Sequence, residues 1–112
     1  MNYELTKDSE KLLCVIYKDY LEKRKTGKTK SEANYYDSSH VIHENLLPQW
    51  LFDDVDDTCR ELSRAGMIDC IWGDNIAIRI HLSDQGISYM ENRFKNGLNE
   101  VMDFISNLPL PF

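Results

Sequence analysis

The fold of this chain is decided by residues 62–90, which read LSRAGMIDCIWGDNIAIRIHLSDQGISYM. At Gly66 the spacing of apolar residues changes from every third or fourth position to every second, which marks the end of a helix and the start of strands. Residues 68–72 and 76–82 alternate between apolar and polar, and the Gly, Asp and Asn between them suit a hairpin turn. The stretch predicts a helix followed by a two-stranded hairpin.

Toward the C-terminus the apolar spacing becomes helical again. Ser83 is placed to cap the next helix, because a serine side chain accepts hydrogen bonds from the first unpaired backbone amides of a helix. The spacing predicts one helix that continues through Gly97 to Ile105. Pro109 and Pro111 follow and end it.

Toward the N-terminus the sequence predicts further helices. Residues 6–26 have helical spacing, begin with a capping threonine, and stop at Gly27. Residues 27–39 are rich in turn formers and have room for a short strand. A short helix over 38–45 and a longer one over 53–65 then complete the pattern.

The predicted order is helix, short helix, helix, hairpin, helix. A lone hairpin is marginal in water, so we expect its apolar face to cover a three-helix core. The expected fold is α+β, mostly helical: a winged helix-turn-helix whose wing is the two-stranded hairpin and whose helix pair is 38–45 and 53–65. The winged-helix domain spans 1–97, and 98–112 is a C-terminal helical extension and tail of the same domain. The expected core residues are Leu13, Ile16, Val55, Leu62, Ile68, Ile78, Ile80 and Met90.

Two stretches also resemble a known superfamily. Residues 62–68, a hairpin, and then residues 81–90 are similar to the C-terminal half of bacterial winged-helix regulators. In those proteins the last wing strand leads into a helix that starts with a five-residue pattern. The pattern is leucine, then threonine or serine, then an acidic residue, then any residue, and then glycine. The chain is most similar to the YjcQ-like group of small bacterial and phage proteins, over about residues 5–105. The resemblance implies the fold and a regulator role, and it supplies no catalytic residues.

The composition indicates one globular domain. The chain has 112 residues and a net charge of −6, and its length suits a single core. The chain has three cysteines, Cys14, Cys59 and Cys70. Because the number is odd, no two form a CxxC pair and all three lie in apolar segments, we expect buried free thiols. The sequence shows no secretory signal and no apolar run near the roughly 20 residues of a membrane span, so we expect a cytoplasmic protein.

Patterns for catalysis or metal binding are weak. His40 and His43 share one helix face at a spacing that can hold a metal, but further ligands are scattered. The aspartates between 53 and 57 lack the spacing of a calcium loop and suit the positive end of a helix dipole. No nucleophile or phosphate-loop motif is present. We therefore expect no enzyme activity, metal or cofactor.

The densest positive charge lies in residues 23–30, which we call the basic segment. Together with bases of the third helix and the wing, it gives the candidate nucleic-acid-binding residues: Lys23, Arg24, Lys25, Lys28, Lys30, Arg60, Arg64, Arg79 and His81. The third helix opposes this interpretation, since it is the element that reads a DNA groove in helix-turn-helix proteins. Residues 53–64 hold five acids and two bases, a net charge of −3, and carboxylates repel phosphates.

These charges leave two functions open. The first is a DNA-associated transcriptional regulator that holds DNA weakly through the basic segment. The alternative is a protein–protein interaction module on a winged-helix scaffold that has lost groove binding, which the acidic third helix favours. A positive band that joins the basic segment to the wing supports DNA. A band interrupted by the acids at 53–57 supports a protein partner.

The C-terminal segment also predicts a homodimer, because its apolar residues repeat in a heptad pattern. The expected interface residues are Met90, Phe94, Leu98, Val101, Phe104 and Ile105. Alternatively, Gly97 marks a bend that folds the second half back onto its own domain, which leaves the chain monomeric.

Overall fold

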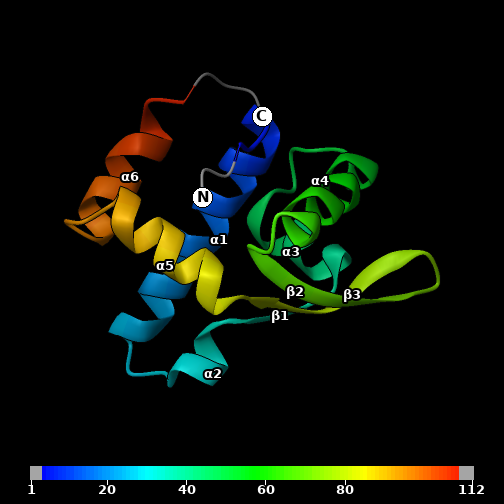
Figure 1. Cartoon of the computed structure of the whole chain (residues 1–112), viewed down its shortest axis with the longest axis horizontal. Helices are drawn as coiled ribbons and strands as arrows, with labels where there is room; N and C mark the ends of the chain where they lie inside the picture. Colours follow the sequence, from blue (N-terminus) through cyan, green and yellow to red (C-terminus); the bar gives the residue numbers. More distant parts are fainter. Residues whose placement is uncertain (1–3, 109–112) are drawn as a thin grey trace.

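The computed structural model describes residues 4–108, so Pro109, Pro111 and the end of the predicted tail lie outside the described residues. The described chain forms six helices and a three-stranded antiparallel sheet, an α+β architecture that is mostly helical (Figure 1). The elements are α1 (Lys7–Lys25), α2 (Lys30–Ala33), β1 (Tyr35–Asp37), α3 (Ser39–Leu46), α4 (Phe52–Arg64), β2 (Ile68–Gly73), β3 (Ile76–Leu82), α5 (Asp84–Arg93) and α6 (Leu98–Ser106). None of these helices is long and apolar enough to cross a membrane.

Helices begin where serine and threonine caps predict them. The Thr6 side chain accepts a hydrogen bond from the Ser9 amide at the start of α1, and Ser38 and Ser83 cap α3 and α5 in the same way. Gly27 follows α1 with a φ of +97°, a conformation that glycine adopts without steric cost. Local signals in the sequence therefore set these boundaries.

The sheet has three strands rather than the predicted two. β2 and β3 pair antiparallel as predicted, and Asp74 and Asn75 adopt positive φ in the turn between them. β1 pairs with the other edge of β3, which gives the strand order β1-β3-β2. A strand of three residues is too short to show an alternating pattern, so its pairing could not be read from the sequence.

The predicted burial of Ile78 is wrong because β3 contains a bulge. Between the paired residues Asp69–His81 and Ile71–Ile78, β3 has two residues where β2 has one. One of the two is Arg79, which has a φ of +50°. An extra residue reverses which face the preceding side chains occupy. Ala77 is therefore buried, whereas Ile76 and Ile78 are half-buried on the outer face of the hairpin.

The remaining predicted core residues are buried: Leu13, Ile16, Val55, Leu62, Ile68, Ile80 and Met90. Aromatic side chains extend this core beyond the prediction. Tyr17, Tyr20, Tyr36 and Trp50 are buried with it. The core thus joins α1, α4 and the inner face of the sheet.

The C-terminal segment is not one continuous helix, so that prediction is wrong and its alternative, a bend, is confirmed. Gly97 has a φ of +77°, and α6 then returns along α1 (Figure 1). Val101 is fully buried, and the ring of Phe104 meets that of Phe94 edge-on, with centroids 5.4 Å apart. Folding back removes apolar surface from water that a projecting helix would expose.

Candidate functional site

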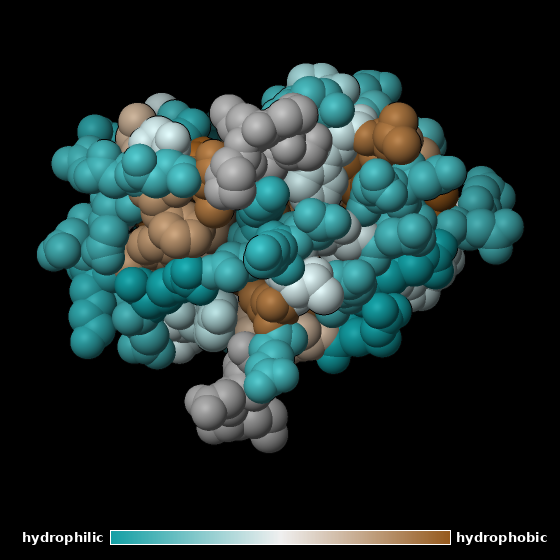
Figure 2. Space-filling view, turned by 90° about the horizontal axis from the view of Figure 1, so that it is seen from above, coloured by the Kyte–Doolittle hydropathy of each residue, from teal (hydrophilic) through white to brown (hydrophobic). Residues whose placement is uncertain are grey.

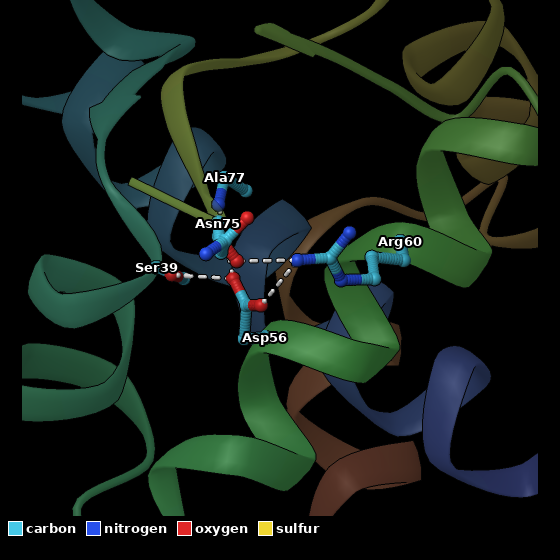
Figure 3. A network of polar contacts seen from close by, with 5 residues as sticks. All are labelled: Ser39, Asp56, Arg60, Asn75 and Ala77. Carbon is cyan, nitrogen blue, oxygen red and sulfur yellow. Dashed lines mark hydrogen bonds and ion pairs between the residues drawn. The ribbon is translucent and has the colours of Figure 1, made fainter. Parts of the chain in front are cut away.

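One of the four aspartates between positions 53 and 57 points into the protein. Asp56 is 6% exposed, and its Oδ1 accepts hydrogen bonds from the Ser39 hydroxyl at 2.8 Å and the Ala77 amide at 3.0 Å (Figure 3). Its Oδ2 pairs with Arg60 at 3.2 Å. One carboxylate therefore joins α3, α4 and β3.

Arg60 connects this carboxylate to the hairpin. Its guanidinium also donates to the backbone carbonyl of Asn75 (Figure 3) and lies 4.3 Å from the centroid of the Trp72 ring. A cation over an aromatic face is attracted to it. The sequence analysis made Arg60 a candidate for binding phosphates, but the structure gives its charge partners within the chain.

The side of α4 that faces solvent is acidic. Asp53, Asp54 and Asp57 are exposed, and Asp57 follows Asp53 by four positions and Asp54 by three, which places it on one helix face with both. We call these three residues the acidic face of α4. Arg64 is exposed at the far end of the helix, and Leu51, just before its start, is 73% exposed. This surface repels phosphates and attracts cationic groups.

The hairpin beside α4 exposes apolar side chains. Ile71 is 48% exposed and pairs across the strands with the half-buried Ile78, while Trp72 is 45% exposed. The turn contributes Asp74 rather than a base. The tip of the hairpin therefore offers no positive charge to a phosphate backbone.

The basic segment is partly neutralised. Lys23 pairs with Asp19 at 2.9 Å, and Lys30 pairs with Asp84 at 2.8 Å. The members that form no ion pair with any described residue are Arg24, Lys25 and Lys28. Figure 1 shows α2, where the segment ends, well separated from the tip of the hairpin. The basic segment and the tip of the hairpin therefore lie at different ends of the sheet (Figure 1).

The structure divides the nine predicted nucleic-acid-binding residues into two groups. Arg60 and Arg64 belong to α4. Arg79 and His81 are exposed on β3, and His81 lies toward the basic segment, because its ring is 4.9 Å from that of Tyr35, which follows α2 closely. The nine residues therefore come from α4, β3 and the basic segment rather than from α4 alone.

No family model, curated protein or solved structure matches the chain. The function is therefore argued from the surfaces of the molecule.

The two histidines noted in the sequence pack around one aromatic ring. The His40 ring stacks on Phe52 with centroids 4.0 Å apart, and His43 meets Phe52 edge-on at 6.0 Å. Nε2 of His43 is also 2.7 Å from the carbonyl oxygen of Trp50. Residues 4–108 contain no group of three His, Cys, Asp or Glu side chains placed to hold a metal.

The cysteines are free, and the predicted burial is confirmed for two of them. Cys14 and Cys59 are buried, and burial raises the pKa of each thiol to about 12. Cys70 is only partly buried, and burial raises its pKa as well. Nucleophilic cysteines need a lowered pKa, so none of the three is activated.

Half of the six predicted dimer-seam residues are turned inward. Met90, Phe94 and Val101 are buried within the chain, and the half-buried members are Leu98, Phe104 and Ile105. Hydrophobic side chains still reach the surface on the left of Figure 2, the side on which α6 lies in Figure 1, and Met102 of α6 is 44% exposed. A homodimer through this remaining surface stays a prediction.

A contact between α1 and α4 gives a test by pH. The hydroxyls of Ser9 and Thr6 donate to Oε2 of Glu61 at 2.5 Å and 2.7 Å, and these bonds lower the pKa of Glu61 below its ordinary value of 4.5. When folding lowers the pKa of a carboxyl group, the group stabilises the folded protein at pH values above its unfolded pKa. This stabilisation is lost as the pH falls through the lower pKa of the folded state. Glu61→Gln should therefore lose less stability than wild type between neutral pH and about pH 3.

Urea unfolding at both pH values measures this difference. Glu44→Gln, on the exposed surface of α3, is the control and should lose as much stability as wild type. An equal acid-induced loss in Glu61→Gln and wild type would show that the contact does not contribute.

Proposed function

We propose that this chain is a winged-helix module that binds a basic protein partner through the acidic face of α4. The winged-helix part is supported by a helix pair, α3 and α4, that is followed directly by the hairpin β2–β3. In DNA-binding helix-turn-helix proteins the second helix of such a pair is the one presented to the ligand, the DNA groove. The described architecture and the resemblance of residues 62–68 and 81–90 agree with this assignment.

The observation that carries the proposal is the charge that α4 presents. Asp53, Asp54 and Asp57 are exposed, while the positive charge of Arg60 is paired with Asp56. Like charges across an interface exclude a partner, and opposite charges speed its association. The helix expected to contact a partner is therefore suited to a cationic protein surface rather than to phosphates.

The hairpin supplies an apolar part beside the acidic one. Asp57 lies three residues before Arg60 on α4, and Arg60 contacts the Trp72 ring. Trp72 is therefore the hairpin side chain that continues the acidic face. Aromatic residues are enriched at the centres of protein interfaces, where burial of their rings stabilises binding. A basic segment with an apolar side chain fits this surface.

The test is a selection of random displayed peptides on the full chain. Selected peptides should be rich in lysine and arginine with an apolar residue among them. Replacing Asp53, Asp54 and Asp57 together with asparagine should weaken their binding by on the order of tenfold, since three exposed charge pairs contribute this much.

A matched control replaces three exposed acids elsewhere, Glu4→Gln, Asp8→Asn and Asp103→Asn, which changes the net charge equally. It should bind the peptides as wild type does. Peptides without basic residues, or equal weakening in both variants, would contradict the proposal.

A DNA-associated regulator is the second candidate, and one observation favours it. Arg24, Lys25 and Lys28 have no ion-pair partner among the described residues, and β1, which follows this segment closely, pairs with β3 at His81. Binding of a DNA duplex at low salt distinguishes the two functions. If the chain binds DNA, Lys25→Gln with Lys28→Gln should lower the salt slope by about 0.9 per lost phosphate contact. The α4 variant should then bind DNA no more weakly than wild type.

A further inference from the structure

We infer that the pocket between α1, β1 and α3 binds a single organic cation, an ammonium or guanidinium group. It is lined by residues of all three elements and has a volume of about 200 Å³. The inference rests on the geometry of this pocket, whose lining includes no residue of α4. The two proposals can therefore fail separately.

The floor of the pocket is apolar and its rim is polar. Tyr36 and Ile42 are buried beneath it, with Val41 and Leu46 beside them. The rim carries acidic and amide side chains together with the Tyr35 ring, which is 40% exposed. The polar lining residues are Asp19, Lys23, Asp37 and Asn45. A cavity of this kind buries an alkyl chain while its charged end stays at the rim.

The pocket already holds one ammonium group of the chain itself. Nζ of Lys23 lies 2.9 Å from a carboxylate oxygen of Asp19 and 4.1 Å from the centroid of the Tyr36 ring. A carboxylate and an aromatic face together are the groups that proteins use to hold alkylammonium ions. The lining is therefore suited to organic cations.

A second carboxylate at the rim has no cation. Asp37 forms no ion pair with any residue in the described part of the chain, and the Tyr35 hydroxyl donates to it at only 3.4 Å. Asp37 has a φ of +62° and lies at an irregularity where β1 shifts register against β3. Bulges at sheet edges redirect a side chain, and here the side chain lines the pocket.

The charges of the lining residues specify the ligand. Asp19 and Lys23 neutralise each other, which leaves the single negative charge of Asp37. One monovalent cation balances it. The cation could come from an arginine or lysine side chain of a protein or from a free small amine, and both share the chemistry that the pocket recognises.

The probe is Nα-acetyl-arginine amide, titrated into the full chain while the backbone amides of Tyr35 and Asn45 are followed by NMR. Saturable shifts are expected. The citrulline analogue, which has the same shape without the charge, should produce none. An arginine placed inside a glycine pentapeptide distinguishes the sources: tighter binding than the amide indicates a protein side chain, and weaker binding indicates a free amine.

Two variants with opposite expected effects decide the matter. Asp37→Asn should weaken binding on the order of tenfold, and it should keep the backbone, because asparagine also tolerates positive φ. Lys23→Met removes the competing ammonium and should tighten binding by several-fold. Replacement of the acidic face of α4 should leave the titration unchanged. Equal shifts with citrulline, no saturation, or unchanged affinity in both pocket variants would overturn the inference.

Discussion

Replacing Asp56 with alanine is expected to destabilise the protein by about 3–5 kcal/mol, because two buried polar groups lose their acceptor and the half-buried Arg60 loses its ion-pair partner. The variant leaves the Ser39 hydroxyl and the Ala77 amide without their acceptor in a region closed to water. Each unsatisfied buried group costs about 1–3 kcal/mol. Because small domains have a total stability of about 5–15 kcal/mol, this single change can bring the chain close to unfolding.

Asp56→Asn separates the two kinds of contact. Asparagine retains an Oδ1 that can accept both hydrogen bonds, and it loses the charge that faces Arg60. We expect a loss of about 1–2 kcal/mol, in the range of one charge-assisted hydrogen bond. Asp57→Asn, at the exposed neighbouring position, should change stability by less than about 0.5 kcal/mol.

Urea unfolding of the three variants measures these differences. A loss in Asp56→Ala no greater than in Asp57→Asn would show that the buried carboxylate contributes nothing. An equal loss in the alanine and asparagine variants would assign the whole effect to Arg60.

The features that the sequence predicted are those set by neighbouring residues. Capping by Thr6, Ser38 and Ser83 needs only amides within three positions, and the turn at Asp74-Asn75 needs only residues that tolerate positive φ. Such signals act before tertiary contacts form. They located the starts of α1, α3 and α5 and the hairpin turn, whereas α4 has no side-chain cap and was located by its apolar stripe.

The features that the sequence did not predict depend on contacts between distant segments. The direction of Asp56 is set by Ser39 and Ala77, which lie on other elements. A weak signal was present, because Asp56 borders the apolar stripe of α4 and precedes Arg60 by one helical turn. The bulge at Arg79 gave no such signal, since the isoleucines around it continue an unbroken alternation.

The candidate site shows the same division. The excess of acids in α4 was evident from composition, and the structure changed which acids are exposed. The pocket at Asp37 could not be predicted, because its lining residues come from three elements and its shape depends on the irregular pairing of β1.

The glycine of the helix-start pattern lies in a contact that admits no side chain. Gly86 is buried in α5, and a Cβ built on it would overlap the backbone carbonyl oxygen of Met67 and crowd Leu82. Ser83 fixes this approach, since its Oγ accepts from the Gly86 amide at 2.9 Å and donates to the Gly66 carbonyl at 2.6 Å. The turn after α4 and the start of α5 are thus held in backbone contact.

Gly86→Ala should therefore destabilise the protein by about 3 kcal/mol, the upper range for an overpacked core. The sign is the reverse of the usual one, because glycine to alanine within a helix ordinarily stabilises it by about 1 kcal/mol. A backbone oxygen cannot move aside as a flexible side chain can, so α5 must shift away from the turn that follows α4. Gly97→Ala is the comparison without a steric contact: no atom lies within 4 Å of the added carbon, and its cost of about 1–3 kcal/mol comes only from a backbone conformation, φ +77° and ψ −143°, that glycine adopts far more readily than alanine. Thermal and urea unfolding measure both variants. A Gly86→Ala protein as stable as wild type would mean that α5 is free to move, and that the spacing between α5 and the α4 turn does not require glycine.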